Sequence, residues 1–336
     1  ESGMAASRWA LYRAQQDLIA TVGQCDENIT LRLFHGRGGS IGRGGGMPRR
    51  AILAEPQGSI NGHLRVTEQG EIIAKKYGLA DIAVRTLEGV LGAIVQHTAG
   101  NEAVEPFPEI WSRTAQCIAE HSRQAYRHMV WENPTFIHYF RNATPIDVIE
   151  RLKIGSRPAS RRSQEGLEGL RAIPWVFAWT QSRHLLPSWF GVGTGLEAAI
   201  KAENLQTLQK MAVDWPFFNT LLANVEMVLA KADMQIAAHY AALAGETGQP
   251  IFNAINEEFA RTHDLVCSIL QSDNLLAADP VLRRAILLRN PYVDPMSLLQ
   301  VDLLRRWRAG DRQDTELQRA LEMTVRGIAR GMQNTG

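Results

Sequence analysis

Apolar residues recur at helical spacing along most of the sequence. The pattern predicts a helix over residues 9–22 and a largely helical region from residue 77 to about residue 139. After residue 196 the pattern is helical throughout, and the last helix is expected over residues 315–332. The chain is therefore predicted to be predominantly helical.

Two aspartate–proline pairs mark expected helix starts in the second half of the chain. Asp279 precedes Pro280 and Asp294 precedes Pro295, so each pair offers a capping carboxylate followed by a proline at the first helical position. A threonine and a proline at positions 144 and 145 open a further short helix. Helices are therefore expected to begin at Pro280, at Pro295 and just after residue 145.

Three short segments are candidate strands. Residues 29–34 alternate apolar and polar side chains, and residues 62–67 form a second candidate. Residues 172–179 form a third, in which Pro174 favours the start of a strand over its centre. The first candidate leads into a run of glycines and arginines. That order is typical of an active site at the carboxyl end of a strand.

Composition narrows the class of protein. The chain of 336 residues is 45% hydrophobic and carries a net charge of +1, which argues against general steering toward nucleic acid. The three cysteines form no CxxC pair, so a reducing, cytoplasmic compartment is expected. No apolar run has the length of a membrane helix, and no signal peptide is visible. Because Glu1 is not an initiator, we expect a piece of a longer chain.

Residues 36–46, the glycine–arginine segment, are the strongest candidate for chemistry. They hold seven glycines and two arginines, which lets backbone N–H groups and guanidinium groups approach an oxyanion. Ile41 breaks the dinucleotide fingerprint, and no Walker motif follows. A folded anion site is favoured over an RNA-binding RGG box or a flexible turn. His35 enters this segment, whereas structural roles are expected for the other histidines.

Each of two further groups of charged residues has two possible interpretations. Residues 151–171 contain five Arg and one Lys against two Glu, and this run is either a solvated basic loop or a means of aiming Arg171 at the site of Arg37. Glu68 and Glu71 are either acids near a site or members of ion pairs.

Several motifs resemble phosphoenolpyruvate carboxylase. They occur in the order of that family, cover the whole chain and correspond to the C-terminal part of a much longer enzyme. Met47 departs from the pattern, since the family usually has proline there. The matching motifs are residues 34–46, 64–71, 155–162, 170–181 and 333–336.

The resemblance implies an α/β fold, namely the C-terminal part of a TIM-like β/α barrel with many added helices. Residues 1–195 would supply later barrel strands and active-site loops, and residues 196–336 a helical region with an inhibitor site. The family assembles as a homotetramer. A non-catalytic regulatory or interaction protein built from this half of the fold is the alternative, and an RGG protein that binds nucleic acid is a distant third.

The reaction that the resemblance implies joins phosphoenolpyruvate and bicarbonate to give oxaloacetate and phosphate. It proceeds through carboxyphosphate and an enolate held on Mg²⁺. Bringing several anions together requires converging cations. The catalytic histidine, the catalytic lysine and the two acidic metal ligands of the family would all lie upstream, so no metal ligand is assigned here, and the chain alone is expected to be inactive.

The resemblance also assigns roles to individual residues. Arg37 and Arg171 resemble the arginines that hold oxygens of phosphoenolpyruvate and carboxyphosphate, and Arg157 is a weaker candidate for the same pocket. Arg43 resembles the arginine on the bicarbonate side of the glycine loop, and His35 lies beside these residues. Together the catalytic candidates are Arg37, Arg43 and His35.

A second site is implied for a C4 dicarboxylate inhibitor such as aspartate or malate. Three cations and one amide suit two carboxylates. Arg43 would belong to both sites, so an inhibitor that holds it would draw the glycine loop away from the substrate. The matching residues are Arg43, Lys231, Arg289 and Asn334.

Overall fold

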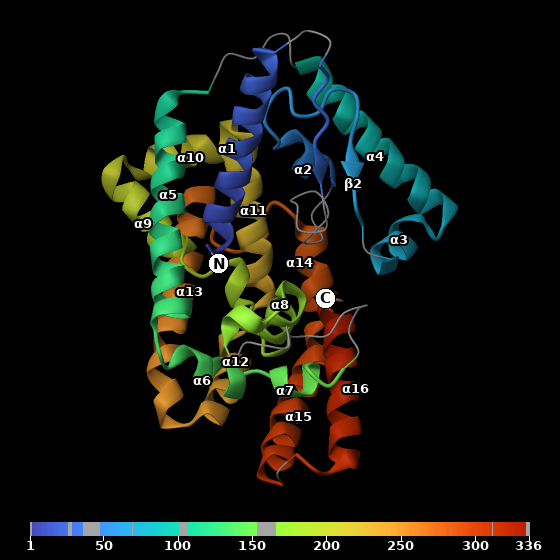
Figure 1. The fold of residues 1–336 in the computed structure, drawn as a ribbon, viewed down its shortest axis with the longest axis vertical. Coiled ribbons are helices and arrows are strands. Elements are labelled where there is room, and N and C mark those ends of the chain that lie inside the picture. Colours follow the sequence, from blue (N-terminus) through green and yellow to red (C-terminus); the bar gives the residue numbers. More distant parts are fainter. Residues whose placement is uncertain are drawn as a thin grey trace.

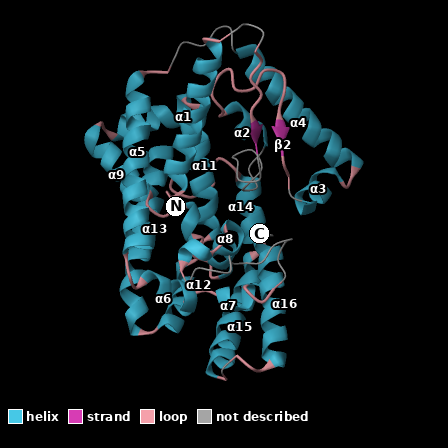
Figure 2. Cartoon of the chain, in the orientation of Figure 1, coloured by secondary structure: helices cyan, strands magenta, loops and turns pink. Residues whose placement is uncertain are grey.

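Helices make up most of the chain in the computed structural model (Figures 1 and 2). The model describes residues 2–25, 29–35, 48–68, 70–100, 107–152, 166–310 and 312–333. No helix within these ranges is both long enough and apolar enough to cross a membrane. The predominantly helical character predicted from the sequence is confirmed.

Long helices packed side by side form the main body. α5 (Glu109–Arg127) contacts α1 (Met4–Gly23) on one side and α9 (Val192–Ala202) on another. α9 also packs on α13 (Gln249–Leu270), which contacts α10 (Leu205–Asp214). The core between them is strongly aromatic, and four of its tryptophans are almost completely buried: Trp179, Trp189, Trp215 and Trp307.

The second part of the body ends in a helical hairpin, drawn in red in Figure 1. Here α15 (Asn290–Ala309) packs along α16 (Thr315–Met332). A Cβ atom at Gly327 would lie 2.6 Å from the sulfur of Met296, so the missing side chain allows the two helices to approach closely. The remaining helices of the body are α6 (Phe136–Asn142), α7 (Ile146–Ile149), α8 (Ala172–Gln181), α11 (Pro216–Lys231), α12 (Met234–Ala241) and α14 (Pro280–Leu287). Short 3-10 or π segments occupy His128–Glu132, Leu167–Gly169, Leu186–Ser188, Ala242–Ala244 and Glu246–Gly248.

A two-stranded parallel sheet lies beside this body. β1 (Phe34–His35) pairs with β2 (Arg65–Val66), with Phe34 opposite Arg65 and His35 opposite Val66. Between and after the strands come α2 (Pro48–Leu53), α3 (Gly70–Tyr77) and α4 (Ala80–Ala99), which pack on one another at the edge of the molecule (Figure 1). Both strands lie at the ends of segments predicted as strands, although they are much shorter than predicted. The barrel and the division at residue 195 stay predictions.

The third predicted strand is wrong. Residues 172–179 lie in α8, which begins directly after an extended Arg171. Pro174 falls in the first turn of this helix, where a backbone N–H has no partner within the helix, so its ring is tolerated. The run is continuously apolar and the second half of α8 is buried, and a continuous apolar run does not distinguish a strand from a buried helix.

The predicted helix starts have mixed outcomes. Asp279 does cap α14, because its side chain accepts a hydrogen bond from the N–H of Leu282 at 2.9 Å. The start at Pro295 is wrong, since α15 begins earlier, at Asn290, and runs through Pro295. The carboxylate of Asp294 instead binds the guanidinium of Arg183. The predicted start after residue 145 and the predicted range of the last helix are confirmed by α7 and α16.

Candidate functional site: two places for anions

The carboxyl ends of the parallel strands meet at one edge of the sheet. His35 ends β1 and is 9% exposed, and its backbone carbonyl accepts a hydrogen bond from the N–H of Thr67 at 2.9 Å. Its Nε2 atom is buried and has no hydrogen-bond partner within the described part of the chain. The glycine–arginine segment follows His35 directly and lies outside the described residues, together with Arg37 and Arg43.

Glu68, which follows β2, takes part in an ion pair. Its carboxylate binds the ammonium group of Lys76 on α3, and both side chains are largely buried. Burial, with a smaller contribution from the Glu68 carboxylate, raises the pKa of the neighbouring Tyr77. The ion-pair interpretation of Glu68 is therefore confirmed, whereas the side chain of Glu71 is outside the described set.

A cavity of about 340 Å³ opens beside His35. Its walls come from α1, the chain leading into β1, the turn after α2, and α11. Most of the lining is apolar, but Glu55 contributes a buried carboxylate that accepts a hydrogen bond from the side-chain amide of Gln15 at 2.6 Å. Burial raises the pKa of the Tyr12 hydroxyl on the same wall. Of the three predicted catalytic residues, His35 is the one found in the described lining of this cavity.

Arg171 stands on a different element from His35. It is the residue before α8, which packs against α7 and α16, and its carbonyl accepts a hydrogen bond from the N–H of Trp175. Its Nε atom is buried without a hydrogen-bond partner among the described residues. A buried donor of this kind is suited to an incoming oxygen atom. No described contact joins Arg171 to His35, and Arg157 lies outside the described residues.

Two of the four predicted inhibitor-site residues line one small cleft. Lys231 ends α11 and Arg289 precedes α15, and both line it together with Gly331 at the end of α16. We call this the Lys231–Arg289 cleft; its remaining lining residues are Ile286, Asn290, Val293 and Met332. Asn334 and Arg43 lie outside the described residues, although Asn334 follows the lining residue Met332 by only two positions.

Arg289 is held in place by backbone carbonyls. Its Nε donates to the carbonyl of Ala285 at 2.6 Å, and its Nη1 donates to the carbonyl of Gly331 at 3.2 Å. Burial lowers the pKa of this guanidinium, but an arginine stays protonated in proteins. The cleft therefore carries a fixed positive charge next to Lys231, which suits a small anion.

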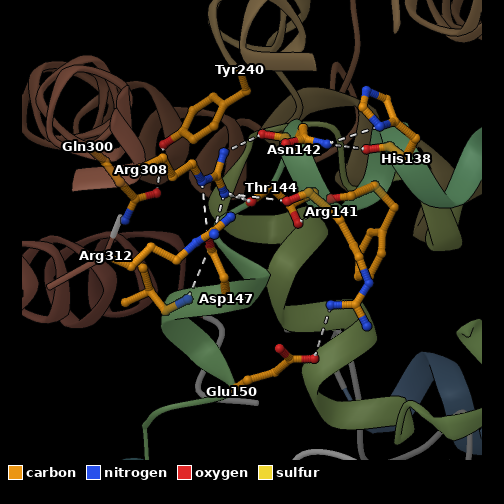
Figure 3. Close-up of polar contacts among 12 residues, drawn as sticks. His138, Arg141, Asn142, Thr144, Asp147, Glu150, Tyr240, Gln300, Arg308 and Arg312 are labelled. Carbon is orange, nitrogen blue, oxygen red and sulfur yellow. Dashed lines mark hydrogen bonds and ion pairs between the residues drawn. The ribbon is translucent and has the colours of Figure 1, made fainter. Parts of the chain in front are cut away.

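A second charged cluster, at the other end of α15, joins α15 to α6 and α7 (Figure 3). Arg308 binds both carboxylate oxygens of Asp147, at 3.0 and 2.9 Å, and donates to the carbonyls of Asn142 and Thr144. Arg312 binds the same carboxylate at 3.2 Å. The hydrogen-bond donors of Arg308 are all engaged by the Asp147 carboxylate and by backbone carbonyls that link α15 to α6 and α7, so we assign this cluster a structural role.

The described part of the chain contains no cluster of metal-binding side chains. No set of three His, Cys, Asp or Glu side chains there could hold an ion. The described residues therefore do not fit the magnesium ion that the resemblance implies, and no step is derived through it.

Sequence reasoning missed Arg183, which is 1% exposed and makes contacts to three helices. It follows the apolar run of α8 by two positions, and neither charge nor spacing distinguishes it from a surface arginine. Its partner Asp294 was predicted to cap a helix because Pro295 follows it, and that prediction was wrong.

Comparison with known proteins gives a consistent result. A family model described as phosphoenolpyruvate carboxylase matches residues 1–336. A phosphoenolpyruvate carboxylase from Xanthomonas oryzae is 50% identical over 100% of this chain and 37% of that protein. Proteins of the same name from Roseiflexus castenholzii and Yersinia pseudotuberculosis are 45% and 44% identical, over 99% and 100% of this chain.

The matched region is only part of these relatives. The chain spans 37% of the Roseiflexus protein and 38% of the Yersinia protein. Because the family model covers residues 1–336, the assignment does not depend on a single motif. The chain belongs to the phosphoenolpyruvate carboxylase family.

Proposed function

We propose that the intact protein carboxylates phosphoenolpyruvate with bicarbonate, releasing oxaloacetate and phosphate. The observation that carries the proposal is the family match along the whole chain, with His35 and the glycine–arginine segment at the end of a parallel strand. The activity is a proposal because the chain spans about 37% of the relatives that bear the name. Those relatives are named as carboxylases, so the non-catalytic alternative is not favoured.

The proposed reaction exchanges one bond at phosphorus and then forms one carbon–carbon bond. A bicarbonate oxygen bonds to phosphorus while the bond from phosphorus to the enol oxygen breaks, giving carboxyphosphate and the pyruvate enolate. Carboxyphosphate divides into CO₂ and phosphate, which keeps the bicarbonate proton. The methylene carbon of the enolate then attacks CO₂ to form oxaloacetate.

The role of this chain in that reaction is to hold and orient anions. We assign Arg37 and Arg171 to the phosphoryl and carboxylate oxygens, with Arg157 as a further ligand. Arg43 is placed beside bicarbonate, next to His35. A planar guanidinium fork can hold two oxygens at once and stabilise charge that develops in the transition state. The Nε of Arg171 is buried and has no hydrogen-bond partner among the residues that the structure describes, which supports this role.

Magnesium would supply a Lewis acid for the developing enolate charge. Its acidic ligands are proposed to lie outside this chain. The homotetramer and the cytoplasmic location also stay predictions.

The test of the function is an assay of the intact protein in which oxaloacetate is reduced with NADH. The account predicts NADH oxidation that requires both phosphoenolpyruvate and bicarbonate. Arg171→Lys should lower turnover about 100-fold, because lysine keeps the charge but loses the fork. Arg141→Lys is the matched control, since Arg141 is half exposed and pairs with Glu150 at 3.7 Å. Equal turnover in both variants would remove Arg171 from the site.

We further propose that the Lys231–Arg289 cleft binds a C4 dicarboxylate such as aspartate or malate, with Asn334 and Arg43 as additional ligands. The support is that Lys231 and Arg289 line one cleft although 58 positions separate their numbers in the sequence. Lys231→Ala should raise the aspartate concentration needed for half-inhibition about tenfold, within the usual range of allosteric coupling. The control is Lys201→Ala, an exposed lysine on α9. Unchanged inhibition in Lys231→Ala would contradict the site.

A further inference from the structure

Arg183 is a buried cation that none of the proposed catalytic or inhibitor roles uses. It lies after α8, is 1% exposed and has a φ of 62°, a left-handed conformation that few residues other than glycine adopt. A buried charge in a strained backbone position persists only where the surroundings hold it firmly. Its partners therefore indicate what it is needed for.

Those partners come from three helices. The Nε of Arg183 donates to the carbonyl of Lys231, the last residue of α11, at 3.3 Å. Its Nη1 donates to Oδ1 of Asp294 on α15 at 2.5 Å. Its Nη2 lies 4.0 Å from Oδ2 of Asp233, the capping residue of α12. The carbonyl of Arg183 also accepts a hydrogen bond from the N–H of Asp233 at 3.0 Å.

Two of these contacts fix walls of the Lys231–Arg289 cleft. One holds the backbone of Lys231, and the other holds Asp294, which directly follows the lining residue Val293. The third wall is the end of α16, which Arg289 holds through the carbonyl of Gly331. Arg183 therefore joins the wall that carries Lys231 to the helix that begins beside Arg289.

We propose that Arg183 is a positioning residue that sets the separation of Lys231 and Arg289, and thereby the affinity of the cleft for a C4 dicarboxylate. Two carboxylates at a fixed distance on one ligand require two cations at a matching distance. A planar guanidinium can serve the Lys231 carbonyl and both aspartates at once, whereas a lysine ammonium cannot span the same groups. This inference rests on the proposed dicarboxylate site.

The test compares Arg183→Lys with Arg308→Lys in the intact protein. Both arginines are largely buried and bind carboxylates and carbonyls, but Arg308 does so at the far end of α15. Two quantities are measured: the aspartate concentration for half-inhibition, and the rise in melting temperature that aspartate causes. The rise reports binding without activity. Arg183→Lys should raise the half-inhibition concentration about tenfold and reduce the thermal shift, and Arg308→Lys should change neither.

A second variant keeps the test decisive if Arg183→Lys does not fold. Asp294→Asn removes one charge at a side chain that is 34% exposed, and it should weaken aspartate binding in the same direction. Wild-type aspartate response in both Arg183→Lys and Asp294→Asn would overturn the positioning role. Lys231→Ala distinguishes this failure from failure of the site: if Lys231→Ala also responds normally, the cleft does not bind the dicarboxylate.

Discussion

The two predicted anion sites differ in how completely the described residues assemble them. Lys231 and Arg289 line the same cleft, and its walls are the ends of long, well-packed helices. His35 and Arg171, in contrast, lie on separate elements, and no contact between them is described. The other arginines of the proposed catalytic site, Arg37, Arg43 and Arg157, lie outside the described residues. The described half of the proposed regulatory site is thus built by the helical body, whereas the proposed catalytic site depends mainly on segments that connect elements.

A second contrast separates the surroundings of the two sites. In the Lys231–Arg289 cleft, the apolar lining residues Val293 and Met332 are only 1% and 5% exposed. On α4, which follows β2 and α3, Leu87, Leu91 and Val95 recur along one helical face and are 55%, 62% and 60% exposed. Helix faces with such apolar exposure usually require a partner surface. We infer that the sheet region is the part of this chain that is least complete by itself.

The largest predicted effect is the loss of all carboxylation in the isolated chain. The catalytic lysine, histidine and metal ligands are proposed to lie outside it, and the apolar face of α4 favours aggregation. Purified residues 1–336 should form no oxaloacetate from phosphoenolpyruvate and bicarbonate in the presence of magnesium. Steady oxaloacetate formation by this polypeptide would show that the catalytic site needs nothing more than this chain.

The next largest effect is expected from Arg37→Lys in the intact protein. Loss of the guanidinium fork should lower turnover about 100-fold or more, while the melting temperature should stay close to that of the wild type. Turnover and thermal unfolding are measured on the same preparation. Retention of more than about half of the wild-type turnover would be incompatible with the role assigned to Arg37.

A smaller effect should follow from Gly331→Ala, which changes a residue that lines the cleft. A Cβ atom at Gly331 would overlap Cγ2 of Val293, so either the Val293 side chain or the end of α16 must shift. The concentration of aspartate for half-inhibition should rise about fivefold, near the lower end of typical coupling, with turnover in the absence of aspartate less affected. The control is Gly310→Ala, where a Cβ would meet only ordinary contacts, the nearest at 3.7 Å. Identical inhibition curves for the two variants would show that the spacing of these helices is unimportant.

The smallest effect concerns acid stability of the helical body. Burial lowers the pKa of His184 to about 3, and Nε2 accepts a hydrogen bond from the hydroxyl of Tyr139 at 2.7 Å. The unfolded chain therefore takes up a proton near pH 6.5 that the folded chain does not. The free energy of unfolding should fall by about 1 kcal/mol per pH unit as the pH drops from 6.5 toward 4. In His184→Gln this slope should be smaller; an equal slope would assign the acid sensitivity to other groups.

The sequence predicted the elements whose signals are local. The last helix was predicted from its apolar face, and Asp279 was recognised as a cap because the capping bond spans only three residues. The strand expected over residues 172–179 was wrong because periodicity cannot show that an apolar run is buried on all sides. Asp294 was misinterpreted for a related reason: its partner, Arg183, lies 111 positions away and can be found only from the tertiary structure.

For the two proposed sites, the family resemblance identified residues that the periodicity of the sequence could not group together. The structure brings Lys231 and Arg289 together, which no spacing in the sequence indicates. The proposed roles of Arg37, Arg43, Arg157 and Asn334 stay predictions, because these residues lie outside the described ranges.

The measurement that tests the central claim most directly follows the oxygen atoms of bicarbonate. The intact protein is supplied with phosphoenolpyruvate and ¹⁸O-labelled bicarbonate, and the phosphate released is analysed by mass. If a bicarbonate oxygen attacks phosphorus in a site lined by Arg37 and Arg171, one labelled oxygen should appear in each phosphate formed with oxaloacetate. Phosphate without label, formed at the same rate as oxaloacetate, would contradict the account.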